Sequence, residues 1–256
     1  ANVVNFYKSL TGPQERQGNQ YIGLSRIDWN ASPRNQISTT LNILRWVSPN
    51  GQQTAPTHGY HVSANGDDMV DTESVIGRWT ATVTPRLVSE LRFQWGRDFE
   101  YVTVSSPGPY VSVTNGVNFG MYNGNPRAAY PDEKRWQLSQ DFSWLRGRHS
   151  VKFGYDFTRV NDLMINLYNG GGNYSYSTLN DMALDCSNPA LPLPLKNCVA
   201  DPNATGVVGK HYSSFTQQFD SLGLGGKTQF STSDWAAYIE DSFKPLTTLT
   251  LPLGLR

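Results

Sequence analysis

The sequence predicts an all-β fold: an antiparallel up-and-down transmembrane β-barrel segment of about eight strands, with short periplasmic turns and long extracellular loops. Three observations predict it: apolar and polar residues alternate in several segments, short and long links alternate between those segments, and aromatic residues are abundant without any long apolar run. Aromatic residues make up 12 % of the 256 residues, with seven Trp and thirteen Tyr, and the mean hydropathy is −0.47. These values are typical of strands that give half their positions to a polar lumen. They exclude transmembrane helices, which need about 18 consecutive apolar residues.

The alternation is clearest between Trp136 and Val160, where two arms of about ten residues flank the link 145–148. Apolar side chains share one face of each arm, with Asp141 among the polar residues of the opposite face, which predicts a hairpin with one apolar and one polar face. The apolar positions are Trp136, Leu138, Phe142, Trp144, Val151, Phe153, Tyr155 and Phe157. About ten residues are enough for a tilted strand to cross the hydrocarbon layer. Trp136 and Trp144 share a face and lie roughly 19 Å apart along the membrane normal at about 45° of tilt. We therefore expect an aromatic girdle at the two edges of the apolar band, formed by Trp79, Trp95, Trp136, Trp144 and Trp235.

The same alternation predicts the other strands, in chain order, except the first, whose pattern is mixed. They cover about 21–29, 37–43, 75–83, 87–101, 235–243 and 249–255, while residues 1–19 are expected to form a loop and no segment has helical periodicity. Short turns at 31–35, 84–86, 145–148 and 244–247 alternate with links of about 25, 30 and 70 residues. Outer-membrane barrels place their short turns in the periplasm and their long loops outside the cell, so this order is typical of such a barrel.

The strand at 87–101 carries four charged residues on its polar face: Glu90, Arg92, Asp98 and Glu100. We expect them to face the lumen, where they either line a ligand path or simply contact lumen water. The 21 basic and 21 acidic residues balance, so the charge gives no reason to expect a nucleic-acid partner.

Arg45, Arg97 and Arg159 each interrupt an apolar face near the far end of an outgoing strand. We expect the three to lie at the outer interface and to contact the anionic headgroups of outer-membrane lipid and lipopolysaccharide. The alternative is that the membrane-spanning part of each strand simply ends there.

The longest link contains both cysteines and three tyrosines that are candidates for ligand contact. Cys186 and Cys198 are expected to form a disulfide outside the cytoplasm, which would stabilise the loop by about 3 kcal/mol in the chain-entropy model. Two free thiols or a metal site are the alternatives. Tyr174, Tyr176 and Tyr212 either stack on a sugar or siderophore or pack loop against loop. No nucleophile motif accompanies the Ser, His and Asp residues, so we expect neither enzymatic activity nor a cofactor.

Three segments together resemble the barrel of TonB-dependent outer-membrane receptors, in particular the Oar-like branch: TATVTPRLVSELRFQWGRDF at 80–99, DFSWLRGRHSVKFGYDF at 141–157 and DWAAYIEDSFKPLTTLTLPLGLR at 234–256. Pro252 stands where that branch usually has Asn, and a proline inside a strand favours an edge or a bulge. The residues that match the two motifs of the branch are Trp144, Gly147, His149, Lys152, Phe153, Gly154, Asp241, Pro245, Leu249, Thr250, Leu251, Leu253, Gly254, Leu255 and Arg256.

The resemblance implies a receptor or transporter barrel of the Gram-negative outer membrane that takes up an unidentified small ligand such as a siderophore, carbohydrate or peptide. It also implies coupling to the TonB complex through other parts of a longer protein. Residues 1–256 are then expected to be a partial barrel domain without plug or TonB box. Two alternatives stay open: a passive pore or surface adhesion barrel, and a soluble β-sandwich that binds carbohydrate.

Overall fold

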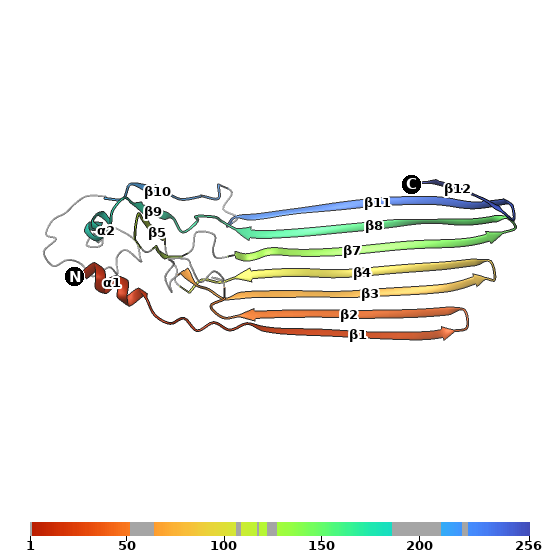
Figure 1. The fold of residues 1–256 in the computed structure, drawn as a ribbon, viewed down its shortest axis with the longest axis horizontal. Coiled ribbons are helices and arrows are strands. Elements are labelled where there is room, and N and C mark those ends of the chain that lie inside the picture. The colour runs from red at the N-terminus through yellow and green to blue at the C-terminus, as the bar shows by residue number, and fades with distance from the viewer. Residues whose placement is uncertain are drawn as a thin grey trace.

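The computed structural model describes residues 2–51, 64–105, 109–116, 118–121, 127–185, 211–221 and 225–256. Its main feature is one antiparallel sheet in the order β1-β2-β3-β4-β7-β8-β11-β12, so each strand pairs with its neighbours along the chain (Figure 1). This is the predicted up-and-down order, and the fold class is confirmed. The bounds are β1 Asn19–Ser32, β2 Asn35–Ser48, β3 Asp68–Thr84, β4 Leu87–Val102, β7 Arg127–Arg146, β8 His149–Asn166, β11 Lys227–Leu246 and β12 Leu249–Leu255.

The register of the sheet steps steadily from strand to strand. Asn35, the first residue of β2, lies level with Phe142 of β7, Leu87 of β4 with Trp144, and His149 of β8 with Arg146. From one short turn to the next, which lies two strands further along the sheet, the level of the turn therefore shifts by two residues. One residue per strand corresponds to a tilt of about 35°, which matches the strand tilt of closed barrels.

The strands are longer than the alternation predicts. β3 begins at Asp68 instead of Val75, β7 begins at Arg127, and β8 continues to Asn166. The extra residues are mostly polar, and they lie at the end of the sheet away from the short turns. Backbone pairing alone holds strands together above the bilayer, where no apolar outer face is needed, so the apolar pattern marks only the part of each strand that crosses the membrane.

Beyond the long-link end of the sheet lies a small folded unit, which we call the cap (Figure 1). It contains the sheet β10-β9-β5-β6 and two helices that correct the prediction of a loop at 1–19 without helical segments. Phe6 of the first helix packs edge-on against Phe119, with ring centroids 5.1 Å apart. The cap elements are α1 Asn2–Leu10, β5 Tyr110–Val113, β6 Phe119–Gly120, β9 Asn173–Tyr176, α2 Leu179–Asp185 and β10 Ser214–Thr216.

The buried apolar cluster of the described chain lies in the cap. Its members are Phe6, Val111, Val113, Phe119, Tyr174, Tyr176 and Met182. The large sheet has no comparable core, and most tryptophans of its apolar face are exposed; Trp235 is 73 % exposed. A sandwich would bury those rings between two sheets, so the soluble sandwich alternative has no support. No helix among the described residues is both long and apolar enough to cross a membrane.

Candidate functional site

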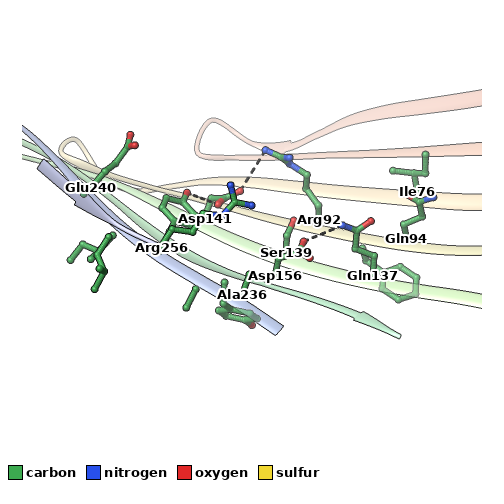
Figure 2. Close-up of a pocket in the computed structure, with 17 residues that line it drawn as sticks. Ile76, Arg92, Gln94, Gln137, Ser139, Asp141, Asp156, Ala236, Glu240 and Arg256 are labelled. Atoms are coloured by element: carbon green, nitrogen blue, oxygen red, sulfur yellow. Dashed lines mark hydrogen bonds and ion pairs between the residues drawn. The ribbon is translucent and has the colours of Figure 1, made fainter. Parts of the chain in front are cut away.

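The polar face of the large sheet, which we call the inner face, contains a hollow of about 830 Å³. The strands that line it are β3, β4, β7, β8, β11 and β12, and alternation brings the polar residues of each strand to this side (Figure 2). Acidic and basic side chains both reach the hollow. The polar side chains that line it, charged and uncharged, include Arg92, Gln94, Gln137, Ser139, Asp141, Asp156, Tyr238, Glu240 and Arg256.

Glu90 is the centre of an ion-pair network beside the hollow. Arg78 of β3 donates to it through Nε at 2.9 Å, and Arg92 donates through Nε at 2.6 Å. The second side of the Arg92 guanidinium lies 3.5 Å from Asp141 of β7. The side chain of Glu90 is only 16 % exposed. Because it is partly removed from water, its negative charge needs partners, and the two guanidinium groups provide them. The network holds Arg92 in place at the wall of the hollow.

Tyr238 of β11 crosses the whole width of β8 to reach β7. Its hydroxyl donates to Oδ1 of Asp141 at 2.7 Å, although β8 lies between the two strands. The residue of β8 that is level with both is Gly154. A Cβ atom at Gly154 would stand 3.0 Å from Cε1 of Tyr238 and 2.8 Å from Oδ1 of Asp141. The missing side chain therefore makes the space in which this hydrogen bond forms.

The predicted lumen charges all lie on the inner face, but they do not form one group. Glu90 and Arg92 belong to the network at the hollow. Asp98, further toward the long-link end, accepts a hydrogen bond from the Thr72 hydroxyl at 3.0 Å. Glu100 lies beyond it, level with Val70 and outside the hollow. Of the four, only Arg92 lines the hollow and is placed to meet a molecule there.

The opposite face, which we call the outer face, carries the predicted girdle. The register places Trp79, Trp95, Trp136, Trp144 and Trp235 on it together with the leucines and phenylalanines. Trp95 and Trp136 are directly paired, with ring centroids 6.2 Å apart. Trp144 lies close to the short turns, and Trp136 lies eight residues further from them, near the middle of β7, as two separate belts require.

The three outer-face arginines lie at one height. Arg45, Arg97 and Arg159 each follow the first residue of their strand by ten positions, and these first residues define the short-turn edge. Each also has a partner in the chain: Arg97 donates to Asp132 at 2.7 Å and 3.1 Å, Arg45 lies 3.7 Å from Asp71, and Arg159 contacts the Ser233 hydroxyl at 3.4 Å. Their contact with lipid headgroups stays a prediction.

The candidate ligand tyrosines lie in the cap. Tyr174 and Tyr176 are 8 % and 1 % exposed and belong to the buried cluster, and Tyr212 packs edge-on against Tyr174. The Tyr176 hydroxyl donates to the fully buried Asp185 at 3.1 Å, and burial raises its pKa above the ordinary value for tyrosine. Packing of loop against loop thus accounts for these rings, and no open ring face of Tyr174 or Tyr176 remains for a sugar.

Asp185 also joins the two ends of the segment that contains the cysteines. It accepts hydrogen bonds from the backbone N–H of His211 at 2.9 Å and lies 2.8 Å from Nδ1 of the same residue. Cys186 and Cys198 lie outside the described residues, so their disulfide stays a prediction.

Sequence reasoning placed Asp141 on the polar face but missed its partners Tyr238 and Arg92. The available signal was Gly154, a glycine without any turn character at a polar-face position in an otherwise regular strand. No group of three or more His, Cys, Asp or Glu side chains that could hold a metal ion exists within the part of the chain that the structure describes.

The comparisons with known proteins agree with this geometry. The model of the outer membrane beta barrel domain family matches residues 1–256. Among solved structures, the outer membrane transporter YddB from Escherichia coli is similar in fold, with a TM-score of 0.56 at 10 % sequence identity. The match covers 95 % of this chain and 27 % of that one, so the chain spans about a quarter of the transporter's length. No curated protein matches in sequence. The chain belongs to the outer membrane beta barrel domain family, and its location is the outer membrane.

Proposed function

We propose that this barrel segment belongs to a TonB-dependent receptor that carries a small polar ligand across the outer membrane. The observation that carries the proposal is the hollow on the inner face with its fixed charges of both signs. A passive pore needs only a wet lumen. A receptor needs side chains held in place before the ligand arrives, because ordering them on binding would cost affinity.

Arg92 is the residue best prepared for this role. Its guanidinium is held by Glu90 and Asp141 from two strands, yet the side chain remains 56 % exposed. A carboxylate, phosphate or hydroxamate group of a ligand could accept a hydrogen bond from its remaining N–H groups. Siderophores, acidic sugars and peptides all offer such groups. The similarity in fold to an outer membrane transporter supports a transport role for the whole protein.

The test is uptake by cells that express the whole protein, measured with a labelled siderophore, an oligosaccharide and a peptide. We expect one of the three classes to enter, and a protonophore to abolish its entry because TonB coupling uses the proton gradient. Arg92→Gln should reduce that uptake roughly tenfold, as expected for a lost charged hydrogen bond. Lys134→Gln, on the outer face of β7, is the matched control and should leave uptake unchanged.

Each rival has its own outcome. Uptake that persists with the protonophore and is unchanged in the Arg92→Gln variant would identify a passive pore. Binding of cells to a surface without uptake of any probe would identify an adhesion barrel. Either result would reject the proposal.

A further inference from the structure

All four short turns of the sheet carry basic residues and no acidic ones. The turn segments are 31–36, 83–88, 145–150 and 243–249, and none contains Asp or Glu. Together they present five basic side chains, which we call the basic rim: Arg34, Arg86, Arg146, Arg148 and Lys244. Such a distribution is unexpected in a chain whose acidic and basic residues balance.

The four turns lie together at one end of the sheet, opposite the cap (Figure 1). All five side chains of the basic rim are exposed. Short turns of outer-membrane barrels face the periplasm. The rim therefore lies at the periplasmic boundary of the membrane.

The basic rim differs from the basic residues on the faces of the sheet. There, most basic side chains pair with a carboxylate, as Arg26 does with Asp28 at 2.9 Å and Lys152 with Glu240 at 3.5 Å; Arg159, which contacts the Ser233 hydroxyl, is an exception. For the five rim residues, no carboxylate of a described residue lies within ion-pair distance.

The contacts that the rim does make leave its charges available. Arg148 donates to the backbone carbonyl of Pro245 at 2.7 Å, and the guanidinium of Arg146 lies 5.4 Å from the centre of the Trp144 ring. Neither partner carries a negative charge, so neither neutralises the arginine.

The apolar outer face continues to the edge of the rim. Trp144, level with Leu87 and Val151, is the last tryptophan before the turn at 147–148. Tryptophan prefers the boundary between hydrocarbon and headgroups, so the side chains just beyond it reach the depth at which lipid phosphates lie. Neighbouring turns are two strands apart, roughly 10 Å. A single small anion cannot bridge that distance, whereas a membrane surface offers many phosphates side by side.

We propose that the basic rim binds the phosphates of anionic phospholipids in the periplasmic leaflet of the outer membrane. Each turn holds its own headgroup, and the arginine guanidinium groups match two phosphate oxygens at once. The rim thereby fixes the depth of this end of the sheet in the bilayer. The inference rests on the membrane location and not on the ligand that the protein carries.

The test measures which lipids remain bound to the whole protein. The protein is folded into vesicles of equal parts phosphatidylglycerol and phosphatidylcholine, extracted in mild detergent, and its bound lipids are counted by native mass spectrometry. We expect the wild-type protein to retain phosphatidylglycerol several-fold over phosphatidylcholine. Salt at 1 M should remove the preference, because the Debye length is then only about 3 Å and exposed charges are screened from the lipid phosphates. The variant R34Q/R86Q/R146Q/R148Q/K244Q should lower the preference roughly tenfold or more.

The matched control keeps the charge and changes only its shape. R34K/R86K/R146K/R148K should retain most of the preference. If the five-fold Gln variant does not fold, R34Q/R86Q replaces it, because these two side chains make no hydrogen bond or ion pair with another described residue, and it should lower the preference by a smaller amount. A wild-type protein without lipid preference, as expected if the rim binds an acidic periplasmic protein instead, would overturn the proposal. So would a preference that survives in the Gln variants.

Discussion

Replacing Gly154 by Ala should destabilise the protein, although alanine normally stabilises a strand relative to glycine. The new Cβ would stand 2.3 Å from the backbone oxygen of Gln140 and 2.8 Å from Oδ1 of Asp141. Something must move, and the least constrained group is the Tyr238 ring, whose Cε1 lies 3.0 Å from the same position. The hydrogen bond from Tyr238 to Asp141 is then lost.

The expected magnitude follows from two contributions. A hydrogen bond to a charged group contributes about 1.5–3 kcal/mol, and the crowding against Gln140 adds about 1 kcal/mol. Gly154→Ala should therefore lower the free energy of unfolding by about 2.5–4 kcal/mol. The assay is urea unfolding of the protein in lipid vesicles, followed by tryptophan emission and by the gel mobility of the folded form.

Gly96→Ala is the matched control, because a Cβ at Gly96 on the same face meets its nearest neighbour at 3.6 Å, an ordinary contact. It should change the free energy by no more than about 0.5 kcal/mol. In a Tyr238→Phe background, which already lacks the hydrogen bond, Gly154→Ala should cost only about 1 kcal/mol. Equal effects of the two alanine variants, or full additivity with Tyr238→Phe, would refute the reasoning.

Three further predictions concern the cap and its flanking cysteines. Phe119→Ala should destabilise the cap by about 3–5 kcal/mol and leave the sheet intact, which amide hydrogen exchange resolved by segment would reveal; faster exchange in the strands would contradict it. Burial raises the pKa of Tyr7 to about 12, and its hydroxyl has no partner among the described residues. Because unfolded tyrosine ionises near pH 10, cap stability should be constant below that pH and fall above it, and Tyr7→Phe should weaken this fall in an alkaline exchange titration. Cys186 and Cys198 should resist alkylation until a reductant is added, as intact-mass measurement would show; alkylation without reductant would identify free thiols.

The arrangement of the sheet was predictable because each strand's pattern is local. Alternation between Trp136 and Val160 fixes both faces of one hairpin, and the link lengths fix which end each turn occupies. The ends of the strands were not predictable, since the residues of β3 from Asp68 to Ser74 pair through their backbone while their side chains follow no apolar pattern.

The cap and the network at the hollow escaped prediction for a different reason. β5 pairs with β9 in parallel, with Tyr110 level with Asn173, and nothing in a short sequence window shows such a distant partner. The same holds for Tyr238 and Asp141, which meet across an intervening strand. Helix α1 was overlooked although Phe6 and Leu10 have helical spacing, because nine residues make a weak periodic signal.

The cap also reverses a familiar rule of protein engineering. Surface loops normally accept foreign peptides, and regular strands reject them. Here the chain between β4 and β7 and the chain between β8 and β11 share one sheet and one cluster of rings, so an epitope tag placed in either should disturb both. A tag meant to leave the cap untouched belongs at the opposite end of the sheet, in a hairpin such as the one between β7 and β8.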